Sequence, residues 1–328
     1  MKRLHGAPIA LAAAIGAATL GAQDARAQAA AAYPAKPIRI IVALAPGGGV
    51  DTAARFVAQR LSEQWGQQVI TENRPGAGGT IAAEAVARAA PDGYTLLMNS
   101  TGHVVSPSLY KLPYDVMRDF TPITLVVLSP SIFAAHPSLP AKTVKEVIAL
   151  AKARPNELLF SSSGTGGTQH LALELFNQMA GVRILHVPYK GTAPSMTDLV
   201  GGRVSLSMAS IVSSMPHVRS GRLRALAVIS NKRSVAVPEL PTIAESGVPG
   251  YAVDTWYGAF APGGTPREIV LKLQQEMSRG IAQPEVREKL LAVGLEPVGN
   301  PQDQFAAYVK AEYEKWGKLV RDVKMTVE

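Results

Sequence analysis

The sequence predicts an α/β protein of two lobes with a cleft between them. Apolar segments of strand length alternate along the chain with segments whose apolar residues recur every three or four positions, which is typical of parallel sheets covered by helices. The order of strand, glycine-rich turn and helix begins at Ile38 and starts again near Glu157. A chain of 328 residues is long enough for two such units.

The first unit opens on the continuous apolar run Ile38–Ala45, as expected for a strand buried on both faces of a parallel sheet. After three glycines, apolar residues at helical spacing continue to Trp65, which indicates a helix that packs back on the sheet. A second strand near residues 67–75, a second helix near 79–93 and a third strand near 94–102 follow. The first unit is therefore a βαβαβ arrangement.

The second unit repeats this design. Thr143 and Glu146 form a capping box that opens a helix. Residues 157–181 then read as strand, glycine turn and helix, and residues 183–202 read the same way. A last helix is expected after Pro301.

Two crossings between the lobes are expected. The apolar run 123–137 is broken at Ser129-Pro130, which suits an outward crossing, and the apolar run around Leu226–Val228 suits the return. We therefore predict a first lobe of residues 37–128 and 227–328 and a second lobe of residues 129–226.

The N-terminus has the parts of a secretory signal. Lys2 and Arg3 precede an apolar run, and the small-x-small site Ala25-Arg26-Ala27 follows it. The run is short and rich in Ala and Gly, which argues against a membrane anchor. We expect a signal peptide of residues 1–27, cleavage near Ala27 and a periplasmic location.

The composition excludes several classes of site. With no Cys, the chain has no disulfide framework, thiolate metal site or thiol nucleophile. The net charge of +8 favours anionic ligands mildly, and no basic run interleaved with aromatic residues indicates nucleic-acid binding. Histidine and carboxylate spacings typical of metal sites are missing, so we predict neither a metal nor a cofactor.

The glycine turns indicate anion binding. Ligands of open α/β sheets bind at the carboxyl ends of strands, where helix N-termini present unpaired N–H groups. Glycine lets that backbone approach an anion closely. The turns are "APGGGVD" at 45–51, "SSSGTGGT" at 161–168 and "PYKGTAPS" at 188–195, and opposite lobes supply them. A small ligand with a carboxylate held from both sides fits this pattern.

Nucleotide binding and catalysis fit less well. A dinucleotide fingerprint from Gly47 or Gly164 would need glycine at Thr52 or Gln169, and no phosphate-binding loop with a Gly-Lys-Ser/Thr ending exists. Ser163 and His170 lie close in sequence, yet the nucleophile elbow of serine hydrolases is missing. An exported α/β enzyme that acts on a small carboxylate or ester remains the alternative. The ligand-binding lobes of a transcription regulator share the architecture but would need an N-terminal helix-turn-helix.

Several segments together resemble one family. They are "YPAKPIRIIVALAPGGGVDTAAR", "ITENRPGAGGTIAAEAVARAAPDGYTLL", "SPSLYKLPYD", "LFSSSGTGGTQHLALELF", "VPYKGTAPSMTDLVGGRV", "ELPTIAESGVPGY" and "WYGAFAPGGTP", in this order along the chain. The chain is similar to the Bug family, the extracytoplasmic solute-binding proteins of tripartite tricarboxylate transporters. One departure is Val50, which stands where relatives often carry a hydroxyl residue.

The resemblance implies a two-lobed periplasmic-binding-protein-like (type II) fold that closes over a small organic carboxylate or amino acid. It also implies that the protein performs no chemistry on this ligand and delivers it to the membrane subunits of a transporter. A monomer without a cofactor is expected. The candidate ligand-binding residues are Gly47, Gly48, Gly49, Asp51, Thr52, Ser100, Thr101, Ser163, Gly164, Thr165, Gly166, Gly167, Thr168, His170, Tyr189, Lys190, Gly191 and Asp198.

Some of these residues also have a purely structural interpretation. Asp51 and Thr168 are suited to cap their own helices. His170 and Tyr189 could instead belong to the packed interior, and Asp198 could orient its own loop. Lys190 is the obvious counter-ion, although lysines beside turns are usually solvated. Asp254 and Trp256, which precede another turn, are expected to serve lobe packing.

Overall fold

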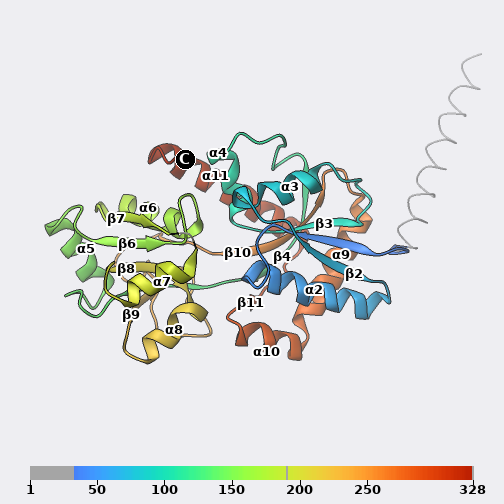
Figure 1. The fold of residues 1–328 in the computed structure, drawn as a ribbon. Coiled ribbons are helices and arrows are strands. Elements are labelled where there is room, and N and C mark those ends of the chain that lie inside the picture. Colours follow the sequence, from blue (N-terminus) through green and yellow to red (C-terminus); the bar gives the residue numbers. More distant parts are fainter. Residues whose placement is uncertain (1–32, 190, 327–328) are drawn as a thin grey trace, which may run out of the picture.

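The computed structural model describes residues 33–189 and 191–326, and these fold into two lobes, each with its own β-sheet and helices (Figure 1). The predicted signal peptide and Lys190 lie outside the described residues. No helix among the described residues has the length and apolarity needed to cross a membrane.

The first lobe is built on a mixed sheet of six strands. Their order across the sheet is β11-β4-β10-β3-β1-β2, with β1 parallel to β2 and β3, and with β10 antiparallel to β3 and β4. The strands are β1 (Ile38–Val42), β2 (Val69–Asn73), β3 (Thr95–Ser100), β4 (Phe120–Leu128), β10 (Trp256–Pro262) and β11 (Glu296–Pro297). The predicted βαβαβ start of the chain is confirmed.

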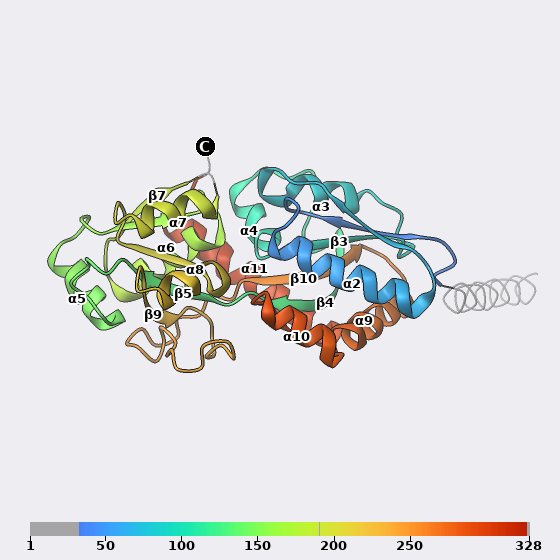
Figure 2. The same ribbon diagram turned by 60° about the horizontal axis from the view of Figure 1, so that its bottom comes forward.

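Helices cover both faces of this sheet (Figure 2). They are α2 (Gly49–Trp65), the short 3-10 helix η1 (Ala77–Gly79), α3 (Thr80–Ala87), α4 (Gly102–Leu109), α9 (Arg267–Ala282), α10 (Pro284–Ala292) and α11 (Gln302–Asp322). Helix α2 buries Val50, Val57 and Leu61 against the sheet, as the spacing of its apolar residues predicts. That burial fixes the N-terminus of α2 beside the end of β1.

The second lobe has a five-stranded sheet in the order β7-β6-β8-β5-β9. Its strands are β5 (Ser131–Ala135), β6 (Leu159–Ser162), β7 (Leu185–Pro188), β8 (Leu206–Ser210) and β9 (Arg224–Val228), and its helices are α5 (Val144–Ala153), α6 (Thr168–Ala180), α7 (Thr192–Val200) and α8 (Ile211–Arg219). Strand β6 is parallel to β7 and β8, whereas β5 is antiparallel to β8 and β9. The carboxyl ends of β6, β7 and β8 lead into α6, α7 and α8.

The outward crossing falls at Ser129-Pro130 between β4 and β5, as predicted. The predicted return at Leu226–Val228 is wrong, because these residues form β9 of the second sheet. The chain stays in the second lobe until Val253, whose amide donates to the carbonyl of Ile229 at 2.8 Å, and it enters the first sheet at Trp256. An apolar run can complete either sheet, so its sequence did not reveal which one it joins.

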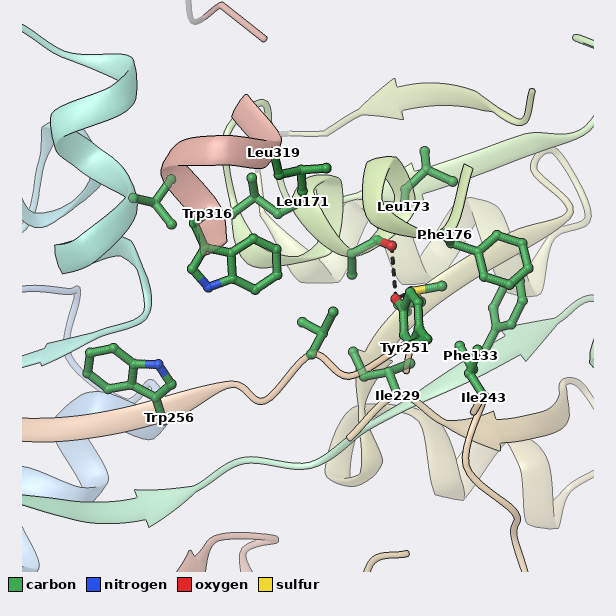
Figure 3. Close-up of a cluster of buried hydrophobic side chains, with 14 of the residues drawn as sticks. Phe133, Leu171, Leu173, Phe176, Ile229, Ile243, Tyr251, Trp256, Trp316 and Leu319 are labelled. Carbon is green, nitrogen blue, oxygen red and sulfur yellow. Dashed lines mark hydrogen bonds between the residues drawn. The ribbon is translucent and has the colours of Figure 1, made fainter. Parts of the chain in front are cut away.

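Helix α11 joins the two lobes. It packs on α4 and β4 of the first lobe and on α6 of the second (Figure 2). Trp316 of α11 belongs to the same buried cluster as Leu171 of α6 (Figure 3). In that cluster the hydroxyl of Tyr251 donates to the carbonyl of Ala172 at 2.9 Å. The segment that returns to the first lobe is thus anchored to the second one.

Candidate functional site

A cleft between the lobes has two adjoining parts that share Leu44, Ser100, Ser163 and Thr168. The larger part, of about 540 Å³, is called the hydroxyl chamber because ten side chains that line it carry a hydroxyl group. These are Thr52, Ser100, Ser129, Ser131, Ser163, Thr168, Thr192, Ser210, Thr255 and Tyr257. The smaller part, of about 380 Å³, is called the apolar chamber and is lined by Leu44, Val105, Leu109, Tyr110, Leu171 and the second glycine turn, residues 163–168.

The first glycine turn borders the hydroxyl chamber through Gly47 and Gly49. Gly47 has a φ of 81°, a left-handed conformation that favours glycine. A Cβ on Gly49 would lie 2.6 Å from the hydroxyl oxygen of Tyr257, so only glycine allows this approach. Gly48 lines neither chamber and has room for a Cβ, with the carbonyl oxygen of Ala45 the nearest atom at 3.6 Å.

Asp51 supports this turn from inside the protein. Its carboxylate is buried and accepts hydrogen bonds from the amide of Gly47, the Nε of Arg55 and the Nδ2 of Asn73, each at 2.9 Å. Burial acts to raise the pKa of Asp51, but these hydrogen bonds, with that from Arg55 the largest, hold the pKa below its ordinary value. The ionised carboxylate therefore shapes the turn and lines neither chamber.

Hydrogen bonds to neighbouring side chains also hold the second glycine turn in place. The amide of Ser163 donates to the Oε1 of Gln169 at 2.6 Å, and the amide of Gly164 donates to the Oγ of Ser162 at 3.1 Å. The amide of Gly166 donates to the Nδ1 of His170 at 3.1 Å. These bonds fix residues Ser163, Gly164, Thr165, Gly166, Gly167 and Thr168 along the cleft.

Two histidines stack beneath this turn. The rings of His170 and His186 lie 3.7 Å apart and nearly parallel, and the Nε2 of His186 lies 2.5 Å from the Oγ of Ser162. Burial lowers the pKa of both rings to about 4, and the neighbouring His186 adds to the shift of His170. Both are therefore neutral near pH 7. His170 thus supports the turn and lines neither chamber.

The remaining candidates differ in position. Ser100 lines both chambers, whereas Thr101 is buried and its hydroxyl accepts from the amide of Trp256 at 3.4 Å. Tyr189 donates to Asp198 at 2.7 Å, and neither side chain lines a chamber. Gly191 has a φ of 112° and lies just before α7, whose first residue, Thr192, faces the hydroxyl chamber.

Sequence reasoning missed six of the ten hydroxyl side chains that line the hydroxyl chamber. Ser129 and Ser131 flank the crossing at Pro130, and Ser210 ends β8. The rule that ligands bind at the carboxyl ends of strands could have found Ser210. Thr192, Thr255 and Tyr257 were missed as well. Val50, in contrast, is buried in the core of the first lobe and does not reach the cleft.

The cleft can bind an anion without a side-chain counter-ion. Helices α2, α6 and α7 begin at its wall, and within the described part of the chain no side chain caps their first amides. Helix starts of this kind attract negative charge. Among the described residues that line the two chambers, none is Asp, Glu, Lys or Arg. Residues 33–189 and 191–326 also contain no group of three or more His, Asp or Glu side chains placed to hold a metal ion.

Comparison with known proteins agrees with this geometry. Residues 53–325 match the family model described as the tripartite tricarboxylate transporter family receptor. BugT of Bordetella pertussis is 37% identical over 293 residues, which are 88% of this chain and 90% of BugT. The structure of Rpa4515 of R. palustris with adipate is 38% identical with a TM-score of 0.78, over 90% of this chain and 100% of that one.

MatC of Rhodopseudomonas palustris with bound malate is 34% identical with a TM-score of 0.74, and the match covers 88% of this chain and 100% of that one. These likenesses extend over both lobes. The chain therefore belongs to the Bug family of tripartite tricarboxylate transporter receptors and is a periplasmic-type solute-binding protein.

Proposed function

We propose that this protein captures a small organic carboxylate or amino acid between its lobes in the periplasm and delivers it to the membrane subunits of a tripartite tricarboxylate-type transporter. The observation that carries the proposal is the meeting of α2 from one lobe with α6 and α7 from the other at the wall of a single chamber. The adipate of Rpa4515 and the malate of MatC, both carboxylates, support it.

Binding by both lobes explains how capture would be signalled. A carboxylate that accepts hydrogen bonds from the first turn and from α6 binds the closed arrangement better than an open one, so it shifts the population toward closure. Each hydrogen bond to a charged group contributes about 1.5–3 kcal/mol. Several such bonds are enough for micromolar affinity, about −8 kcal/mol, after the costs of association.

The proposed contacts are the candidates that line the cleft. They are Gly47, Gly49, Thr52, Ser100, Ser163, Gly164, Thr165, Gly166, Gly167 and Thr168, joined by Ser129, Ser131, Thr192, Ser210 and Tyr257. Asp51, Thr101, His170, Tyr189 and Asp198 act behind this lining by the contacts described above, and the carbonyl of Gly48 accepts from the amide of Thr52 at 2.9 Å. We also propose that the receptor is a monomer and that the mature chain begins after Ala27, which mass spectrometry of the exported protein would show.

The alternative, an exported enzyme, would use the close Ser–His pair that lies beneath the second glycine turn. The Oγ of Ser162 lies 2.5 Å from the Nε2 of His186. The same Oγ also accepts from the amide of Gly164 and donates to its carbonyl, and Ser162 is fully buried. A hydroxyl engaged in this way is poorly placed for attack on a substrate. We propose that the protein has no catalytic role.

A thermal-shift screen of the mature protein against small carboxylates and phosphate tests the proposal. We expect at least one carboxylate to raise the melting temperature. The Gly48→Glu variant, which places a negative charge at the start of α2, should lose that shift, whereas Gly48→Ala should keep it because a Cβ fits there. No shift with any compound would contradict the receptor function. Consumption of a carboxylate or ester by the protein would favour the enzyme.

A further inference from the structure

One side chain of the hydroxyl chamber differs in chemistry from its neighbours. Gln169, the second residue of α6, lines this chamber. Among the described residues that line the two chambers, it is the only one whose side chain carries a nitrogen atom. The other polar side chains there are hydroxyls, which rotate and can either donate or accept a hydrogen bond. The nitrogen of Gln169 can only donate.

The second glycine turn orients the side-chain amide of Gln169. The backbone amide of Ser163 donates to its Oε1 at 2.6 Å. A backbone N–H can only donate, so the side-chain atom that it meets must be the oxygen, and the Nε2 must occupy the other terminal position. Turning the side chain over would place two donors against each other. The fold therefore sets the direction of the Nε2 before a ligand binds, which reduces the ordering cost of a contact with it.

The Nε2 of Gln169 is available to a ligand. The hydrogen bond to Ser163 is the only one that the Gln169 side chain makes with residues 33–189 and 191–326, and it uses the oxygen alone. The Nε2 is also absent from the fully buried side-chain atoms of this part of the chain that lack a partner. An unused donor on the wall of the hydroxyl chamber thus remains open to an acceptor in the cleft.

We propose that Gln169 is a specificity-determining residue of this receptor and that its Nε2 donates directly to a carboxylate oxygen of the ligand in the hydroxyl chamber. This inference rests on the proposed function. The start of α6 favours negative charge at the same place, so the two effects act together. A ligand that presents an N–H group there is selected against, because two facing donors would both lose their hydrogen bonds.

The Gln169→Glu variant separates this role from support of the turn. Its carboxylate keeps an acceptor for the amide of Ser163 but replaces the donor by an anion. Isothermal titration compares the mature parent and variant proteins with hexanoate, benzoate and adipate. We expect each carboxylate that binds the parent to bind the variant at least tenfold more weakly. Unchanged affinity would overturn the inference and leave the receptor function standing. Absence of binding by every carboxylate to the parent would overturn both.

Carboxamides distinguish a direct contact from repulsion at a distance. Hexanamide, benzamide and the monoamide of adipate each present an N–H₂ group in place of one carboxylate. If residue 169 contacts the ligand, the carboxamide of at least one bound carboxylate should bind Gln169→Glu at least tenfold more tightly than it binds the parent, because the new anion accepts from its N–H₂ group. Equal or weaker binding of every carboxamide would refute the direct contact.

Gln275→Glu is the matched control for net charge. Gln275 is exposed on α9 and lines neither chamber. The same change at this residue should alter the affinity for each carboxylate and carboxamide by less than twofold. A loss of carboxylate affinity as large as that of Gln169→Glu would mean that the charge of the whole protein, rather than a contact at residue 169, sets the affinity.

The Gln169→Met change covers the case in which the glutamate variant does not fold. Methionine has a similar length and removes the donor without adding a charge. A hydrogen bond to an ionised acceptor is roughly twice as strong as one to a neutral acceptor. A bound carboxylate should therefore lose about tenfold in affinity for Gln169→Met, and its carboxamide should lose less. Equal losses for the two ligands would mean that residue 169 acts only through the turn, which contradicts the proposal.

Discussion

Val212, at the start of α8 in the second lobe, packs against Gly294, which follows α10 in the first lobe. A Cβ on Gly294 would overlap the Cγ2 of Val212. Val212 and Val293 both line the hydroxyl chamber, so this contact between the lobes borders that chamber. The lobes can approach this closely only because residue 294 is glycine.

We therefore expect Gly294→Ala to hold the lobes apart and to weaken binding of the carboxylate with the largest thermal shift by about tenfold, or 1.4 kcal/mol. The φ of 69° at Gly294 also makes alanine costly, by about 1 kcal/mol of folding stability. Isothermal titration measures the affinity and urea unfolding measures the stability.

The double variant Gly294→Ala/Val212→Ala separates the two effects. Shortening residue 212 removes the overlap, so binding should recover while the loss of stability remains. If the double variant binds as weakly as the single one, the contact does not control closure.

Gly49→Ala should impair binding more than Gly48→Ala. The new methyl at residue 49 would meet the ring and hydroxyl of Tyr257, which lines the hydroxyl chamber, and must displace it. We expect an affinity loss of tenfold or more, although alanine is the better helix former by about 1 kcal/mol. At residue 48 the methyl fits, so its effect should stay within about twofold. Titration of both variants with the same carboxylate checks this, and equal losses would contradict the geometry.

Stability should fall as the pH decreases from 6.5 toward 4. The pKa of His170 and of His186 is about 4 in the folded protein, and an unfolded histidine has a pKa near 6.5. Between these values the unfolded chain binds more protons, so the free energy of unfolding decreases as pH decreases, and well above 6.5, where the histidines are neutral in both states, these groups cause no change. His103, with a pKa of about 3 because of burial, adds to the effect.

The variant His186→Phe isolates the stacked pair. It keeps an aromatic ring on His170 but removes one titrating group, so the loss of stability between pH 7 and pH 4.5 should be smaller by about 1 kcal/mol after allowance for solvent screening. Urea unfolding at the two pH values measures the difference. An identical loss in the variant and the parent protein would show that the pair does not titrate on unfolding.

Glu312 should be required for the packing of α11. Its buried Oε2 accepts from the Nε1 of Trp316 at 2.7 Å and from the Nε1 of Trp256 at 3.3 Å. Glu312→Leu leaves two buried donors unpaired and should cost about 3 kcal/mol of folding stability. Glu312→Gln keeps an acceptor oxygen and should cost less. Denaturant unfolding compares the variants, and similar losses would mean that hydrogen bonding is not the cause.

Local signals in the sequence predicted much of the fold. Thr143 caps α5 by accepting from the amide of Glu146 at 3.2 Å, as the capping box indicates. The residues that form such a signal lie within one helical turn of each other, so a short segment of sequence contains all the groups that produce it. The return crossing was mispredicted because β9 is paired antiparallel to β5, and periodicity does not show the partner of a strand.

The candidate site likewise has features that local sequence signals predict and features that they do not. The sequence by itself determined that glycine turns precede helices in both lobes, because turn and helix signals are local. Only the tertiary structure decided that Asp51 turns inward to Asn73, 22 positions away, and that Ser131 and Ser210 face the cleft with Ser100. The direction and the partners of a side chain depend on residues that folding brings close in space. No local sequence pattern encodes these contacts.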